Sequence, residues 1–268
     1  MMNCVKVKVL GADGFTLASS TAGERAGLFY PAAYRSGEKI AVECAHVPCW
    51  CMLQLDESMP ETMVYLNRTE CWFPIPMEEE KCVYSPKSFL GDRHLIRARL
   101  ASEEEILARK NLALNPYDRH GESGIYPHAR ANVETRNESV FAARNAIDGV
   151  LENAGHGAWP YQSWGINRDP NACLTLEFGR LVEIDEIVLT LRADFPHDSW
   201  WEQVTVRFSD GSEECLNLEK SDAPQRFSIT PRTVKQLELC RLIESKDDPS
   251  PYPALVQIQV YGKEAFEK

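Results

Sequence analysis

Residues 173–192 read CLTLEFGRLVEIDEIVLTLR, and they carry the main signal for the fold of the second half of the chain. Its two parts, Cys173 to Phe178 and Ile184 to Arg192, alternate or run apolar and are rich in β-branched residues, so each predicts a strand. Further short strands follow, with turns and no helical crossovers between them: Gln203 to Phe208, Glu213 to Leu218, Arg226 to Ile229, Gln236 to Ile243 and Leu255 to Tyr261. The pattern indicates an antiparallel β-sandwich within residues 126–268.

The first half, residues 1–101, predicts a second and smaller β-sandwich domain. Its apolar or alternating runs are separated by Gly, Pro and Asp turns: Val5 to Leu10, Lys39 to Cys44, Cys51 to Leu55, Met63 to Leu66 and His94 to Leu100. Between the halves, Ser102 and Glu105 make a capping box for a helix that ends before Pro116. We therefore expect an all-β protein of two β-sandwich domains, joined at residues 102–125 by a short helix and a breaker-rich linker.

Composition and charge exclude several classes of function. The 268 residues are 44% hydrophobic and 26% charged, which is typical of an ordered globular protein. The net charge of −11 repels phosphate backbones and anionic lipid, so we expect no nucleic-acid partner and no membrane partner. No stretch approaches the roughly 20 apolar residues that span a bilayer, and the chain opens with a strand-like alternation instead of a signal-peptide core. These features predict a cytoplasmic protein.

The nine cysteines have two interpretations. Most lie in apolar runs, and their number is odd, so we expect reduced, buried thiols that behave as small hydrophobic side chains. Cys49 and Cys51 flank Trp50, which places both thiols on one face of a strand. The alternative is a zinc site made of Cys44, Cys49, Cys51 and Cys71, although their spacing matches no standard zinc-binding pairing.

Four landmarks in the second half carry a resemblance to a known family, and the first of them has two parts. In chain order they are 142–149 (AARNAIDG), 163–165 (SWG), 174–179 (LTLEFG), 208–211 (FSDG) and 256–262 (VQIQVYG). This half resembles the discoidin family, also called the coagulation-factor C-type or galactose-binding-like domain, which includes family 32 carbohydrate-binding modules. The resemblance implies a jelly roll whose loops at one end bind a sugar, a glycan terminus or a lipid headgroup. The first half has no comparable match.

The resemblance also implies a metal ion. Many relatives hold a structural calcium with the Asp of the entry segment, backbone carbonyls and a Glu of the closing strand. Asp148 matches the first position here, but Gln257 occupies the second, which removes one charge from the predicted calcium site. The alternative is that Asp148 and Gly149 simply form a turn.

Two loops supply the candidate ligand-binding residues, and the resemblance implies that they meet at one end of the sandwich. Residues 153–164 combine a glycine-flanked histidine with aromatic side chains stiffened by Pro160, and residues 194–202 carry two adjacent indoles, of which one is expected to face outward. An exposed ring suits the apolar face of a pyranose, while charged groups take its hydroxyls. The candidates are His156, Trp159, Tyr161, Arg192, His197, Asp198, Trp200 and Trp201. A proline-rich loop before the last strand can add Tyr252 to the rim.

No motif marks a catalytic site, and we assign no catalytic residue. The sequence therefore predicts a noncatalytic protein that binds a sugar or sugar derivative through these loops. One alternative is a sugar-modifying hydrolase or metal-dependent enzyme, with its site in the same loops or in the interdomain cleft. Another is a structural oligomerisation module, a homo-oligomer in which the aromatic side chains are buried against a partner chain.

Overall fold

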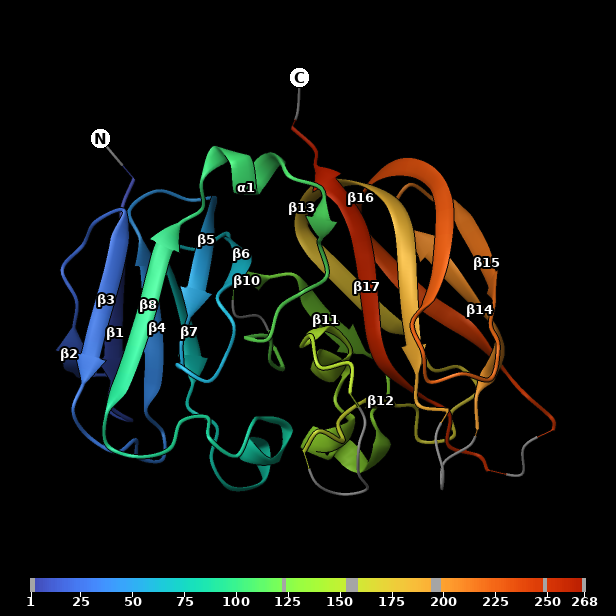
Figure 1. The fold of residues 1–268 in the computed structure, drawn as a ribbon, viewed down its shortest axis with the longest axis horizontal. Helices are drawn as coiled ribbons and strands as arrows, with labels where there is room; N and C mark the ends of the chain where they lie inside the picture. The colour runs from blue at the N-terminus through green and yellow to red at the C-terminus, as the bar shows by residue number, and fades with distance from the viewer. Residues whose placement is uncertain (1–2, 122–123, 153–158, 194–198, 248–249, 267–268) are drawn as a thin grey trace. The chain divides into compact units, whose positions relative to one another are not determined.

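The computed structural model is built almost entirely of β-strands, as the sequence predicts, and describes residues 3–121, 124–152, 159–193, 199–247 and 250–266 (Figure 1). The chain forms two compact units. The first contains Met1–Ile106 and Gly121–Tyr126, and the second contains Leu107–His120 and Pro127–Lys268. None of the helices in the described ranges has the length and apolar character needed to cross a membrane.

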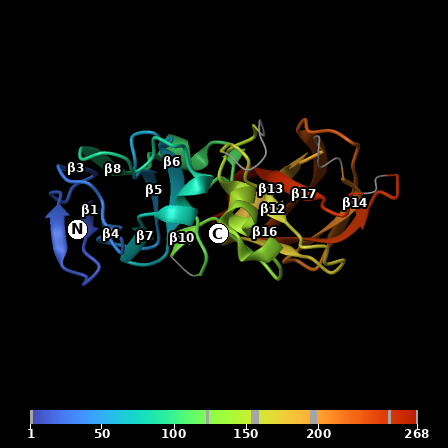
Figure 2. The same cartoon turned by 90° about the horizontal axis from the view of Figure 1, so that it is seen from below.

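The first unit is made of two antiparallel sheets. One has the strand order β2-β1-β4-β7 and the other β10-β6-β5-β8-β3, and Figure 2 shows β3 and β8 in the opposite layer from β1 and β4. The elements are β1 (Val5–Leu10), β2 (Thr16–Ser19), β3 (Arg25–Tyr30), β4 (Lys39–Cys44), β5 (Cys49–Gln54), β6 (Thr62–Leu66), β7 (Glu70–Pro74), the 3-10 helix η1 (Glu78–Val83), β8 (His94–Leu100) and β10 (Ile125–Tyr126). Alternate residues of β1, β3 and β5 are buried, so these strands turn one face toward the core.

The second unit is built around two very long strands. Its elements are β9 (Lys110–Asn111), β11 (His128–Ala131), three 3-10 helices, η2 (Thr135–Asn137), η3 (Ser139–Phe141) and η4 (Ala143–Ile147), then β12 (Trp164–Gly165), β13 (Leu174–Leu191), β14 (Trp201–Phe208), β15 (Glu213–Asn217), β16 (Gln225–Glu244) and β17 (Ala254–Glu264). The sheet order is β12-β17-β13-β16-β14-β15, with β11 added on β13 and β9 on β17.

The strand β13 joins what the sequence predicts as two strands. Its first part pairs with β11 and its second part with β17, while β16 pairs with both, and the three strands β13, β16 and β17 lie side by side in Figure 1. The register shifts between Glu177 and Val182, where Gly179 has a positive φ of 72°. The glycine therefore bends the strand instead of ending it.

The core of the second unit surrounds two indoles. Trp164 and Trp201 are 0% and 1% exposed, and their ring centroids lie 6.3 Å apart. The indole nitrogen of Trp164 donates to the carbonyl oxygen of Val133 at 3.0 Å, which satisfies its polar group. Buried aliphatic side chains of β13, β14, β16 and β17 complete this core.

The predicted linker, residues 102–125, does not form a separate element. The capping box is confirmed: the amide of Ser102 donates to the Glu105 carboxylate at 2.8 Å, and the amide of Glu105 donates to the Ser102 hydroxyl at 3.3 Å. However, the helix α1 spans only Glu103–Leu107, because Lys110–Asn111 pairs with β17 as β9. The segment that follows is divided between the two units.

At Gly262 the backbone of β17 lies very close to that of β13. A Cβ atom at this position would lie 2.0 Å from the carbonyl oxygen of Glu183. Only glycine fits without a shift of the backbone, which explains the glycine at the end of the last strand motif.

We expect Gly262→Ala to lower the free energy of unfolding by about 1–3 kcal/mol or more, because the methyl group forces the two strands apart. Gly27→Ala is the matched control, since a Cβ at this strand position meets nothing within 4 Å. Urea unfolding measures both variants. An equal stability of the two variants would contradict the close approach.

Candidate ligand-binding site

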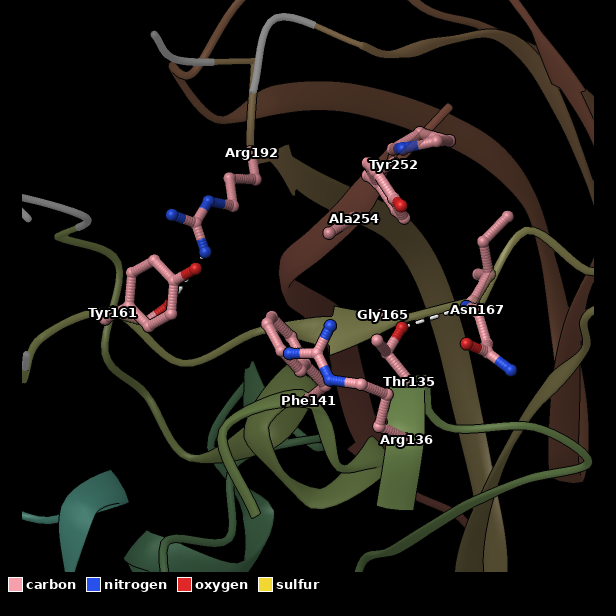
Figure 3. A pocket seen from close by; sticks show the side chains of 11 residues that line it. Thr135, Arg136, Phe141, Tyr161, Gly165, Asn167, Arg192, Tyr252 and Ala254 are labelled. Carbon is pink, nitrogen blue, oxygen red and sulfur yellow. Dashed lines mark hydrogen bonds between the residues drawn. The ribbon is translucent and has the colours of Figure 1, made fainter. Parts of the chain in front are cut away.

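A pocket of about 220 Å³ opens in the second unit, where the 3-10 segments, the loop around β12, the end of β13 and the start of β17 come together (Figure 3). Segments far apart in the sequence contribute to its wall. Tyr161 and Arg192 lie on one side, and Tyr252 and Asn167 on the other. The volume corresponds to several water molecules at roughly 30 Å³ each, so the pocket can hold a small ligand.

The first wall of the pocket is a stacked arginine and tyrosine. The guanidinium carbon of Arg192 lies 3.8 Å from the ring centroid of Tyr161, and its Nη1 donates to the carbonyl oxygen of Tyr161 at 3.1 Å. Both residues are almost fully buried. Arg192 directly follows β13, so the long strand fixes the charged group, and the stacking fixes the loop that carries Tyr161.

Phe141 and Arg136 continue this wall. The rings of Phe141 and Tyr161 meet edge to face at 6.1 Å, and the guanidinium carbon of Arg136 lies 5.4 Å from the Phe141 ring centroid. Arg136 also makes two hydrogen bonds to the carboxylate of Glu138, at 2.5 and 2.7 Å. Aromatic and guanidinium groups therefore alternate along the wall.

The opposite wall is held by two further contacts. The guanidinium carbon of Arg168 lies 4.3 Å from the ring centroid of Tyr252, which is 38% exposed. The backbone amide of Asn167 donates to the hydroxyl of Thr135 at 2.9 Å. These contacts fix an accessible ring beside an amide side chain.

The backbone at the pocket is strained in two places. Arg136 and Asn137 have φ of 52° and 53°, and Asn167 and Arg168 have φ of 49° and 62°. Such left-handed conformations are uncommon for residues other than glycine, although asparagine tolerates them best. Strained pairs of this kind cluster at ligand sites, where the surrounding structure holds them in place.

The structure brings together only some of the predicted ligand-binding residues. Tyr161 and Arg192 line the pocket and contact each other. Trp159 is 37% exposed but is absent from the described lining. His156, His197 and Asp198 lie outside the described residues.

The two adjacent indoles take different positions, and this corrects the placement of Trp201. Trp201 begins β14, faces the core and packs on Trp164, so it cannot reach a ligand in the pocket. Trp200 is half-buried and packs against the same core from its edge. Strand alternation requires the two side chains to point to opposite faces, but it does not say which one is inside.

Several lining residues have no counterpart among the sequence-based candidates. Thr135, Arg136, Phe141 and Asn167 come from segments without a binding motif. The asparagine at position 167 is the one sequence feature that points to this part of the lining, because asparagine favours the left-handed conformation found there. Tyr252 lines the pocket, as its loop position allowed.

A buried network surrounds Asp148, at the position of the predicted calcium. The Gln257 amide nitrogen donates to Asp148 Oδ1 at 2.7 Å and to the carbonyl oxygen of Asn145 at 2.6 Å. The Gln162 amide nitrogen donates to Asp148 Oδ2 at 3.0 Å, and the Gly149 amide donates to Gln257 Oε1 at 3.1 Å. Both oxygens of the Asp148 carboxylate thus accept hydrogen bonds from N–H groups of the protein.

This donor set does not fit a calcium ion. Calcium requires oxygen ligands that point at the ion, and both the carboxylate of Asp148 and the carbonyl of Asn145 are turned to the NH₂ group of Gln257 instead. The amide group takes the place that a cation would need. We therefore derive no role for calcium at Asp148 and Gln257.

No family model and no curated protein matches the sequence. Some solved structures resemble part of the chain at low sequence identity. Chitosan-binding module 1 of a chitosanase/glucanase from Paenibacillus sp. IK-5 is 17% identical, with a TM-score of 0.40 over 58% of this chain and 100% of the module.

Two other resembling structures are named with a bound sugar. The lectin-binding domain of lectinolysin with Lewis b is 16% identical, with a TM-score of 0.43 over 59% of this chain and 99% of that domain. The family 32 module of C. perfringens NanJ with galactose is 15% identical, with a TM-score of 0.38 over 50% of this chain and 91% of the module.

The network predicts a pH dependence of stability. Burial raises the pKa of Asp148 from 3.8 to about 6, against the opposing charge of Arg144 and the donated hydrogen bonds. Because the pKa is higher in the folded state, lowering the pH from about 7.5 to about 5 protonates the folded protein first and stabilises it by roughly 1 kcal/mol. Urea unfolding of the wild type and Asp148→Asn at both pH values measures this gain. A stability difference between the two proteins that does not change with pH would contradict it.

The same network predicts a response to calcium. Millimolar calcium should leave the melting temperature of the wild type unchanged and raise that of Gln257→Glu, because the carboxylate replaces the NH₂ group by an oxygen ligand. Differential scanning calorimetry with calcium, and with magnesium as the control ion, measures the shift. Stabilisation of the wild type by calcium would show that the amide does not fill the site.

Proposed function

We propose that the protein is a noncatalytic binding protein for a sugar or sugar derivative, held in the pocket of the second unit. The observation that carries this proposal is the convergence of Tyr161, Arg192, Tyr252 and Asn167 on one open pocket. A sugar ring has an apolar C–H face and a rim of hydroxyl groups. Aromatic side chains suit the face, and guanidinium and amide groups suit the rim.

The size of the pocket favours a single small ligand. Its volume of about 220 Å³ lies below the roughly 300–1,000 Å³ of pockets that take drug-sized molecules. One ring bound in a small open site gives modest affinity, with a dissociation constant on the order of micromolar to millimolar. This range is sufficient for a binding module.

The lining supports binding without catalysis. The described lining residues carry no carboxylate, imidazole or thiol, the groups that most often serve as general acid, general base or nucleophile. Their charged members are the arginines Arg136 and Arg192. Guanidinium groups stay protonated and donate hydrogen bonds to ligand oxygens, which is a recognition role.

A thermal-shift screen of neutral and acidic monosaccharides tests the proposal. We expect at least one sugar to raise the melting temperature of the wild type, because a ligand of the folded state stabilises it. Tyr252→Ala should weaken binding of that sugar by about 2- to 10-fold, the range expected for the loss of one aromatic contact.

The control for this experiment is Ile243→Ala, which changes an exposed apolar residue outside the pocket lining. It should bind the sugar as the wild type does. If no sugar shifts the wild type, or if Tyr252→Ala binds as strongly as Ile243→Ala, the pocket is not the sugar site.

A further inference from the structure

Three cysteines of the first unit meet in its interior. Cys44 ends β4 in one sheet, and Cys49 and Cys51 lie on β5 in the other, both facing inward as the alternation of the strand predicts. The Cys51 sulfur lies 3.5 Å from that of Cys44 and 3.7 Å from that of Cys49. The three sulfurs all lie within 4.8 Å of one another and form what we call the thiol cluster.

The spacing of the thiol cluster fits a common metal ion. In a tetrahedral zinc site with Zn–S bonds of about 2.3 Å, two ligand sulfurs are about 3.8 Å apart. The observed separations are close to this value, so an ion can be bound with little movement of the strands. The two sheets of the sandwich hold the ligands in place before any ion arrives.

The thiols of the cluster have no stronger partner in the described part of the unit. Their sulfur hydrogen bonds run to each other, and all three residues are buried. Metal binding displaces the protons of such thiols.

Cys71 is close by but is engaged differently. Its thiol donates to the carbonyl oxygens of Gly124 at 3.4 Å and Arg68 at 3.6 Å. It is therefore a buried thiol with oxygen acceptors, outside the cluster. Of the four cysteines in the alternative zinc site, only Cys44, Cys49 and Cys51 therefore bring their sulfurs together.

A surface pocket lies beside the cluster residue Cys44. It is lined by Cys44 together with Cys4, Lys6, Glu43 and Glu70. A proposed metal site needs an entry path in addition to its ligands, and this pocket is the candidate path.

We propose that Cys44, Cys49 and Cys51 bind a thiophilic metal ion of the zinc class. Thiolate sulfur is a soft ligand and selects such ions over calcium and magnesium. The site lies in the first unit and is independent of the sugar pocket. It adds a metal-binding property to a half of the chain that carries no recognised motif.

The test uses the full chain, reduced and freed of metal with a chelator, and titrated with Co²⁺ as a spectroscopic substitute for zinc. We expect one Co²⁺ per chain, an intense thiolate-to-cobalt charge-transfer absorption, and its loss when Zn²⁺ displaces the cobalt. Cys49→Ser and Cys51→Ser should lower the affinity by at least about tenfold. Cys71→Ser, in which a hydroxyl can keep the hydrogen bond to Gly124, should bind as the wild type does.

X-ray absorption at the zinc edge of the wild type keeps the test independent of variant folding. Three sulfur neighbours at about 2.3 Å support the site. The proposal is overturned by a zinc shell of nitrogen and oxygen only, by the absence of charge-transfer absorption, or by equal cobalt binding in Cys51→Ser and Cys71→Ser.

Discussion

The carboxylate of Asp148 is the constraint on which the second unit depends. It accepts hydrogen bonds from Gln257 on β17 and from Gln162 in the loop before β12. The Gln162 side chain in turn accepts from the Tyr161 amide at 3.1 Å. One buried group therefore connects β17, the segment 142–149 that carries Asp148, and the pocket wall. Because an unpaired buried carboxylate is costly, these three segments must adopt their positions together.

This constraint explains how a pocket can be built without a metal ion. A cation and an amide NH₂ group both attract the oxygens of Asp148 and Asn145, but the amide is part of the chain and arrives at the site when β17 pairs with β13. Residues 142–149 thus take their conformation when the chain folds, through groups of the chain itself. The cost of this arrangement is a buried carboxyl group whose pKa is raised, whereas a divalent ion would favour the charged form.

Strand positions could be predicted from the sequence because burial alternates along them, and β1, β4 and β8 have the predicted bounds. The sequence pattern does not predict β3, because the outward side of this strand carries Gly27 and an exposed Phe29, which hides the alternation. The pattern divides the two long strands at Gly179 and near Pro231, since these residues usually signal turns and only the pairing partners show that the strand continues. Local pattern decides the face of a strand, and long-range pairing decides its length.

Two residues of the candidate site can be predicted from the sequence, for different reasons. Arg192 ends a predicted strand, and Tyr161 lies in a loop whose glycines and Pro160 suit the presentation of aromatic side chains. Arg136 and Arg168 carry no such signal of their own, because arginine has no local preference for the left-handed conformation that both adopt. Their backbone follows from contacts made after folding: Arg136 with Glu138, and Arg168 with Tyr252.

These strained positions bear on how a small pocket can bind a ligand. A left-handed conformation costs a residue other than glycine about 1–2 kcal/mol, and the net stability of a domain is only about 5–15 kcal/mol. Burial of the hydrophobic core around Trp164 and Trp201 stabilises the second unit and offsets this cost. The residues at the edge of the pocket thus take their positions when the protein folds. The proposed ligand would then meet side chains that are already in place, so less of its binding energy would be lost to immobilising them.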